Sequence, residues 1–427
     1  FETQVAGVRM RAPMMAINTV AAGGGSILHF DGARYRVGPD SAGAVPGPAC
    51  YRRGGPLTVT DANVMVGKIQ PRHFPAIFGP AGDQPLDAEI VREKFTALAE
   101  EIAAATGGPP QDPRAVAEGF LRIAVANMAN AIKQVSIQKG HDVTRYALNC
   151  FGGAGGQHAC LVADELGMET VFIHPFAGVL SAYGMGLADQ TVIREGAVEA
   201  PLSPEAMPDL ARRLEALAEE GRAELLKQGA EPGRIGAALR LHLRYAGTDS
   251  FLPVPFGPHE EVLAAFTEAH RRRFGFATPE RQVIVEACIA EVTASGEQVE
   301  EARLPERPAG EAPASIDTVP LWTEGAEHRA PVFDRTALLA GDRIPGPALI
   351  REANATTVIE PGWTAEVTAL NHLVLRRTEA RAAARIADPS RPDPVMLELF
   401  NNLFMSIAEQ TGAVLQNTAL SVNIKER

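Results

Sequence analysis

The sequence predicts an α/β protein with more than one domain, and three observations support this class. An apolar run, a glycine-rich loop and a helical pattern follow one another between Tyr146 and Gly167. Apolar residues recur at helical spacing from Asp87 to Thr106, and they alternate with polar residues, as in a strand, from Leu239 to Tyr245. A chain of 427 residues exceeds one ordinary hydrophobic core, so we expect roughly two to four domains.

Composition argues against several classes of function. The formal net charge of -12 at pH 7 provides no basic surface for nucleic acid, and no apolar run reaches the roughly 20 residues that cross a bilayer. We therefore predict no nucleic-acid partner and no membrane partner. The cysteines form no C-x-x-C pair, so we expect free thiols and a cytoplasmic protein. They are Cys50, Cys150, Cys160 and Cys288.

The first candidate ligand-binding segment is a run of three glycines, Gly23, Gly24 and Gly25, followed by Ser26. It leads into a predicted hairpin whose turn contains Asp31-Gly32, a pair suited to positive φ. Residues 38–56 then hold five glycines and four prolines, which predicts a long loop. Long loops in compact domains are often functional.

Asp61 lies where a β-branched run changes to a helix-compatible sequence. Two interpretations are open at this position. As a helix N-cap, its carboxylate would accept the free N–H groups of the first turn. Alternatively, it would orient a phosphate-bound metal ion or an attacking group, which requires phosphate-binding loops nearby.

Two amphipathic helices are predicted next, at 87–106 and from Asp112 to the residue before Gly140. Asp112 is a suitable N-cap and Pro113 fits the first turn. We expect both helices to face the core and to carry no chemistry of their own.

The segment 146–167 is the second candidate ligand-binding segment. Its apolar run ends in four glycines within five residues, among them Gly152, Gly153 and Gly155. Glycine lets backbone N–H groups approach a ligand, and the following helix adds the positive end of its dipole, so the expected ligand is a phosphate or nucleotide. The spacing matches neither a Walker A loop nor a dinucleotide fingerprint. Tight packing between strand and helix is the alternative.

His158 and His174 flank this loop, and each is either a hydrogen-bonded structural residue or a ligand. No H-x-H or H-E-x-x-H spacing occurs, so we predict no metal site made by this chain alone. A strand at 170–173 precedes a helix of small residues from Gly178. Within that helix, residues 181–186 either pack closely on another helix or form a wall of a nucleotide cleft.

The C-terminal half predicts smaller units. A helix at 203–229 is followed by a block of strand, helix and strand that ends near 294, and a linker at 302–316 follows. Short strands from 319 to 375 resemble a small barrel or sandwich, and a second linker spans 378–394. We expect the last segment to be an amphipathic helix whose domain continues beyond it.

Several segments resemble the hydantoinase A/5-oxoprolinase family and occur in the family's order. They are AGGGSI, VGPDSAGAVPGPACY, TVTDAN, FGGAGGQHA and HPFAGVLSAYGMGLAD. Two further stretches are similar to the oxoprolinase type, LRYAGTDS and the tail that begins with DPVMLELFNN. The tail also resembles the start of the hydantoinase B half, which in that type follows the A half on one chain.

The resemblance implies an actin-like ATPase lobe, of the sugar-kinase and heat-shock ATPase type, then α+β and small all-β domains and the first helix of a hydantoinase B domain. It places these parts at 1–200, 201–301, 317–378 and 392–427. Family members carry two acidic phosphate loops upstream of the segment that begins at Phe1. We therefore expect an inactive piece of a longer enzyme.

The resemblance also implies an activity, the ATP-dependent opening of 5-oxo-L-proline to L-glutamate through phosphorylation of the lactam oxygen. ATP and Mg²⁺ are the implied cofactors, a related lactam or hydantoin is the alternative substrate, and the B half on the same chain and a homo-oligomer are the implied partners. The implied site residues are Gly152, Gly153 and Gly155 on the adenosine side of ATP, Gly23, Gly24, Gly25 and Ser26 near the phosphates, Asp61 orienting Mg²⁺ or the acceptor, and His158 as a weaker catalytic candidate.

Three alternatives to this activity remain open. An ATP-dependent N-methylhydantoinase and an acetone carboxylase-type subunit share the A-half motifs. A non-catalytic scaffold or assembly subunit is the alternative from another class.

Overall fold

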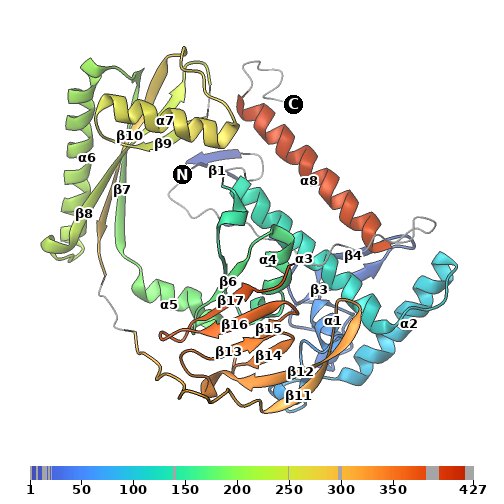
Figure 1. The fold of residues 1–427 in the computed structure, drawn as a ribbon. Helices are drawn as coiled ribbons and strands as arrows, with labels where there is room; N and C mark the ends of the chain where they lie inside the picture. The colour runs from blue at the N-terminus through green and yellow to red at the C-terminus, as the bar shows by residue number, and fades with distance from the viewer. Residues whose placement is uncertain are drawn as a thin grey trace.

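The structure is a computed structural model that describes residues 2–5, 8–11, 17, 20, 22–137, 141–248, 250–296, 301–380 and 394–418. It is a mixed α/β protein, so the predicted α/β class is confirmed (Figure 1). The described residues form two small two-stranded sheets, three larger sheets and the helices that pack against them. The first two-stranded sheet pairs β1 (Glu2–Val5) with β2 (Val8–Arg11).

Residues 22–137 form a hairpin and three helices that pack together in one core. Tyr35 in the hairpin is buried and stacks on Phe120, with 4.4 Å between ring centroids. The predicted helix starts are confirmed, because Asp87 accepts hydrogen bonds from the N–H groups of the first turn and Asp112 accepts one from Arg114. The elements are β3 (Ser26–Phe30), β4 (Tyr35–Ser41), α1 (Val59–Met65), α2 (Ala88–Thr106) and α3 (Pro113–Ile137).

The central sheet joins two distant parts of the sequence. β5 (Leu148–Cys150) lies parallel to β6 (Thr170–Ile173), and the second glycine loop and α4 (Ala159–Leu166) connect them. β17 (Leu373–Arg377) pairs antiparallel with β6, and β16 (Trp363–Val367) then pairs with β17. β13 (Arg343–Pro345) completes the order β13-β16-β17-β6-β5. This sheet therefore combines strands from the predicted ATPase and β-rich domains.

The other strands of the C-terminal β region form a separate four-stranded sheet beside the central one (Figure 1). Its members are β11 (Asp317–Thr323), β12 (Ala326–Asp334), β14 (Ala348–Arg351) and β15 (Thr356–Ile359). The predicted linker at 302–316 runs along this region and is fastened to it. Arg307 donates to both carboxylate oxygens of Asp342, at 2.6 and 2.7 Å.

The third large sheet forms a unit with α6 and α7, at the upper left of Figure 1. Its strand β7 (Gln190–Pro201) was not predicted and begins before the predicted boundary at 200. β7 pairs with β10 along its length, so it belongs to this unit. The other elements are α6 (Met207–Lys227), β8 (Ile235–Tyr245), β9 (Leu252–Pro255), α7 (His259–Phe274) and β10 (Val283–Ala294).

Two helices show large exposed surfaces. Among the described residues, α5 (Leu180–Leu187) buries none of its side chains, so the predicted close packing of residues 181–186 is not present there. α8 (Pro394–Thr418) lies on α3, where Asn402 contacts Asn127 at 3.2 Å, and it leaves Phe400 exposed. None of the helices in the described part of the chain has the length and apolar character needed to cross a bilayer.

Leucines on α6 provide a matched test of the packing in this unit. Leu214 is completely buried, whereas Leu226 on the same helix is 46% exposed. We expect Leu214→Ala to lower the free energy of unfolding by about 2–5 kcal/mol, because it removes apolar contacts and leaves a cavity. Leu226→Ala should lower it by less than about 1 kcal/mol. Urea denaturation of both variants would measure the difference, and equal losses would contradict the described packing.

Candidate active site between two glycine loops

The structure brings the two predicted glycine loops to one cavity of about 310 Å³. Gly23 and Gly24 line it from the first loop, and Phe151 and Gly155 line it from the second. The loops approach each other because α1, whose Thr60 holds the first loop, and α4, which follows the second loop, both pack against α3. Two segments more than a hundred residues apart therefore form a single site.

The walls of the cavity are mostly apolar. Met128 and Ile132 come from α3, and Val162 comes from α4. Cys150 also lines the cavity, and burial raises the pKa of its thiol to about 11, so the thiol is protonated at neutral pH. None of the described residues that line the cavity is acidic. The cavity is suited to the apolar face of a ligand.

In the second loop, tight packing explains most of the glycines. A Cβ on Gly153 would lie 2.6 Å from the Asn354 carbonyl oxygen, and a Cβ on Gly155 would lie 2.9 Å from Cys150 Sγ. Gly152 has φ +91°, a conformation that residues with side chains rarely adopt. The packing alternative therefore holds for Gly153 and Gly155, and Gly155 also lines the cavity.

The first loop is held by the start of α1. The Gly24 carbonyl oxygen accepts hydrogen bonds from the Thr60 backbone N–H at 2.9 Å and from Thr60 Oγ1 at 3.0 Å. A Cβ on Gly24 would lie 2.8 Å from the same hydroxyl, whereas a Cβ on Gly23 would meet no described atom within 4 Å. Gly25 and the buried Ser26 do not line the cavity. The exposed edge of this loop is at Gly23.

Asp61 is fully buried and does not line the cavity. Its carboxylate accepts hydrogen bonds from the backbone N–H groups of Ala49, Cys50 and Thr58, at 3.0, 2.8 and 2.8 Å, and from Thr58 Oγ1 at 2.9 Å. Thr58 is the N-cap of α1, and Asp61 lies three residues later, at the N3 position of a capping box, so the prediction that Asp61 is the N-cap is wrong. Asp61 thus fastens the glycine- and proline-rich loop to α1.

His158 lies at the cavity with its imidazole almost completely buried. Asn63 Nδ2 lies 3.1 Å from His158 Nε2 and 2.9 Å from Gln157 Oε1. Because an amide N–H donates, His158 Nε2 accepts and Nδ1 carries the proton. Burial, and secondarily the charge of Lys68, lower the pKa of His158 to about 3, so the ring is neutral at physiological pH. Nδ1 has no hydrogen-bond partner among the described residues.

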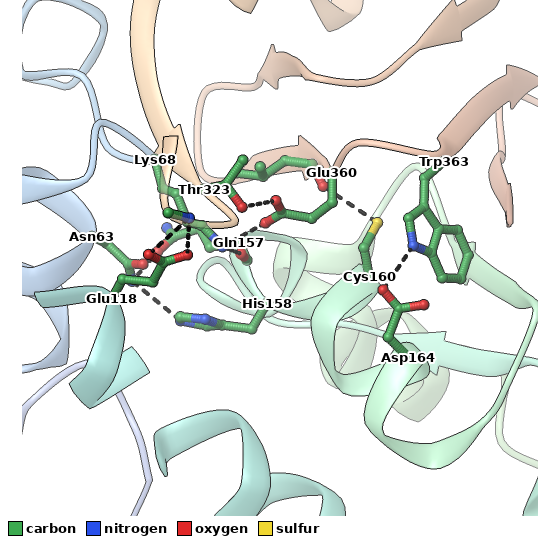
Figure 2. A network of polar contacts seen from close by, with 12 residues as sticks. Asn63, Lys68, Glu118, Gln157, His158, Cys160, Asp164, Thr323, Glu360 and Trp363 are labelled. Atoms are coloured by element: carbon green, nitrogen blue, oxygen red, sulfur yellow. Dashed lines mark hydrogen bonds and ion pairs between the residues drawn. The ribbon is translucent and has the colours of Figure 1, made fainter. Parts of the chain in front are cut away.

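A buried ion pair connects the segment after α1 to the C-terminal β region, next to the second loop (Figure 2). Lys68 Nζ lies 2.6 Å from Glu360 Oε1, and the two side chains are 2% and 3% exposed. Lys68 Nζ also donates to the Gln157 carbonyl oxygen at 3.3 Å, and Thr323 Oγ1 donates to Glu360 Oε2 at 2.7 Å. These contacts fix the position where the glycine loop enters α4.

The residues of this network could not be predicted from the sequence. Lys68 and Glu360 are 292 positions apart, and neither belongs to a local pattern that indicates a partner. A lysine inside the otherwise apolar segment VMVGKI was the available signal. His174, in contrast, lies outside the cavity, beside His372 and Glu301.

Comparisons with known proteins agree with the order of the segments. The family models described as Hydantoinase/oxoprolinase, Hydantoinase/oxoprolinase C-terminal domain and Hydantoinase B/oxoprolinase match residues 1–194, 202–378 and 393–427. The chain is 41% identical to 5-oxoprolinase 1 of Arabidopsis thaliana and 36% identical to 5-oxoprolinase of Dictyostelium discoideum. Each alignment covers 100% of this chain and 34% of the relative. The chain thus spans about one third of the length of these relatives.

A solved structure shares the fold. The ATP-dependent caprolactamase from Pseudomonas jessenii superposes with a TM-score of 0.77 at 27% sequence identity. The match covers 87% of this chain and 54% of the caprolactamase chain.

The Lys68–Glu360 pair should be strongly coupled. We expect Lys68→Met to lower the free energy of unfolding by about 3–5 kcal/mol, because it leaves the Glu360 carboxylate buried without its partner. The double variant Lys68→Met/Glu360→Leu should lose less than the sum of the single variants. Arg92→Met, which breaks the exposed pair with Glu89, is the control and should cost less than about 1 kcal/mol. Additive losses in urea denaturation would refute the coupling.

The acid sensitivity of folding should depend on His158. Its pKa is about 3 in the folded protein and about 6.5 when unfolded, so the unfolded state binds more protons between these values. The free energy of unfolding should therefore fall as pH decreases from about 6.5 towards 3, with a contribution of about 1.4 kcal/mol per pH unit. His158→Gln should remove this part of the slope, and Leu226→Ala, at an exposed position of α6, should not. The measurement is urea denaturation across this pH range, and an unchanged slope in His158→Gln would refute the assignment.

Proposed function

The chain belongs to the hydantoinase/oxoprolinase family, and from that premise we propose that it is part of a 5-oxoprolinase, which opens 5-oxo-L-proline to L-glutamate with hydrolysis of ATP. Whole-chain identities of 41% and 36% to proteins named 5-oxoprolinase support the substrate. The observation that carries the proposal within the structure is the meeting of two glycine loops at one apolar cavity.

The proposal includes an actin-like ATPase lobe, in which the cavity takes the adenosine side of ATP. Support comes from the parallel strands β5 and β6, since ligands of α/β sheets bind beyond the carboxyl ends of such strands. The second glycine loop directly follows β5. The ranges 1–200, 201–301, 317–378 and 392–427 are proposed as family domains, although the central sheet and β7 cross their boundaries.

The residues present fit the base and ribose of a nucleotide. The cavity volume lies at the lower end of the roughly 300–1,000 Å³ of small-molecule sites, and its apolar walls suit a flat aromatic base. Gly155 and Gly23 allow the ligand to approach the backbone, and His158 lies at the same wall. Gly24, Gly25 and Ser26 are proposed to support the phosphate side through the shape of the first loop. Gly152 and Gly153 are proposed to support the adenosine side through the shape of the second loop.

The described residues do not fit Mg²⁺ at this cavity. None of the described lining residues carries a carboxylate, and both oxygens of Asp61 are held by donors within the protein. We therefore propose that Asp61 positions the loop at residues 49–58, and we assign no step through a metal ion to these residues. His158 is likewise proposed to hold the loop, because it is neutral and bonded to Asn63.

The chemistry explains why such an enzyme uses ATP. The lactam amide of 5-oxoproline is stabilised by resonance, and its nitrogen is a poor leaving group. ATP, when bound, supplies a phosphoryl group that activates the lactam oxygen. Phosphoryl transfer requires mainly positioning and stabilisation of charge. On this proposal, the chain contributes two fixed backbone loops and an apolar wall that excludes water from the nucleotide.

The cytoplasmic location, the B half on the same chain and the homo-oligomer are also proposals. Four buried, free cysteines support a cytoplasmic location, because reducing compartments keep thiols unpaired. The match of residues 393–427 to Hydantoinase B/oxoprolinase supports a B half on the same chain. A homo-oligomer is proposed on the family resemblance alone and can be measured by light scattering.

The activity test uses the full-length protein with ATP. We expect 5-oxoproline to stimulate phosphate release with production of glutamate. Hydantoin, caprolactam, and acetone with bicarbonate are the comparison activators. Stimulation by one of these instead of 5-oxoproline would reassign the substrate, and no ATP hydrolysis with any of them would favour the scaffold alternative.

Filling the cavity should weaken nucleotide binding. Ala154 is exposed and lines the cavity, so Ala154→Leu places a larger side chain inside it. We expect the KM for ATP to rise about tenfold or more with a smaller change in kcat, as for loss of ground-state binding. The control is Ala264→Leu, the same substitution at an exposed position of α7. An unchanged KM for ATP would place the nucleotide elsewhere.

A further inference from the structure

A group of potential metal ligands lies outside the cavity, at the end of the central sheet. His174, Glu301 and His372 each offer one ligand atom, and these atoms lie within 4.8 Å of one another. His174 Nε2 is 3.7 Å from Glu301 Oε1. We propose that these three residues bind a divalent first-row transition metal ion such as Zn²⁺.

The sheet register explains why the two histidines meet. Ile173 on β6 lies opposite Leu373 on β17, so the residues just beyond this pair, His174 and His372, lie side by side at the ends of adjacent strands. Their ring centroids are 5.2 Å apart. The two ligands are distant in sequence, and local spacing therefore gave no sign of them.

Two hydrogen bonds hold the Glu301 carboxylate near the histidines. Leu304 donates its backbone N–H to the Ala369 carbonyl oxygen at 2.8 Å, which holds the segment after Glu301 against the turn that precedes His372. Tyr183 Oη donates to Glu301 Oε1 at 3.4 Å. Partners of this kind orient ligating side chains in metal sites.

The donor set has the composition of a zinc site. Two imidazoles and a carboxylate are a known set of three protein ligands for catalytic zinc, and they leave a position for water or a substrate oxygen. Ligands of one zinc ion lie no more than about 4.2 Å apart, since each bond is about 2.1 Å. The side chains must therefore close slightly on the ion. Glu301, which is 39% exposed, has room for this movement.

The proton on His174 must move when an ion binds. The Phe176 backbone N–H donates to His174 Nδ1 at 3.1 Å, so in the free protein Nε2 carries the proton and faces Glu301. An ion at Nε2 takes the place of that proton, and the neutral ring then carries its proton on Nδ1. The Phe176 contact therefore opens on binding, which gives a signal in the imidazole ¹⁵N spectrum.

The position of this group links it to the second glycine loop. Ala177 donates its N–H to the His174 carbonyl oxygen at 2.9 Å, and its own carbonyl oxygen accepts the Gly152 N–H at 2.8 Å. An ion at His174 would therefore lie beside the loop that forms the cavity. The inference does not depend on the proposed function, because binding is measured without nucleotide or lactam.

The test titrates full-length protein, stripped with a chelator and desalted, with Co²⁺ as a spectroscopic probe and with Zn²⁺. We expect the wild-type protein to bind one more equivalent than His174→Gln/His372→Gln, with visible Co²⁺ bands and no thiolate charge-transfer band. Glu301→Gln should weaken this binding about 100-fold or more, and Tyr183→Phe about tenfold. His29→Gln is the matched histidine control and should bind as the wild type does.

Two results would overturn the proposal. One is equal Co²⁺ and Zn²⁺ binding by the wild type and the double histidine variant. The other is full affinity for Co²⁺ and Zn²⁺ in Glu301→Gln. Because Glu301 is exposed, misfolding would not explain a loss of affinity in this variant. Circular dichroism of each variant would verify that it is folded.

Discussion

The buried Lys68–Glu360 ion pair is the constraint on which the arrangement of the site depends. Removing two charges from water costs several kcal/mol per ion, and only close contact and further hydrogen bonds offset this penalty. Here Thr323 supplies one hydrogen bond to Glu360, and the Gln157 carbonyl oxygen accepts one from Lys68. The segment after α1, the glycine loop and the C-terminal β region must therefore assemble together, and this fixes Gln157 next to His158, which lines the cavity.

Local features of the fold could be predicted from the sequence. The caps at Asp87 and Asp112 and the strand, loop and helix at 146–167 depend on neighbouring residues, so their patterns survive in the sequence. β7 was missed because its side chains alternate weakly and its partner, β10, follows much later in the chain. The ion pair and the group around His174 depend on sheet register between distant strands, which no local pattern encodes.

The glycine loops show why a ligand-binding loop and a packing loop are difficult to separate by sequence. Gly153 packs so closely on Asn354 that a side chain would not fit, and Gly152 has a positive φ that favours glycine. Gly155 both packs against Cys150 and lines the cavity. The same is true of Asp61, whose carboxylate is the residue type for a metal site but is fully used by backbone donors. The residue type of Asp61 suggested metal binding, whereas its hydrogen-bond partners show that the carboxylate holds a loop.

The pairing of β17 with β6 also determines when the core can be completed during synthesis. The ribosome releases β6 well before β17, because most of the C-terminal half lies between them in the chain. Until then, Val171 and Ile173 lack the cover that Leu373 and Leu375 give them in the shared core. An uncovered strand edge of this kind favours pairing with other chains. The nascent protein therefore has an aggregation-prone interval whose duration is set by the rate of translation between β6 and β17.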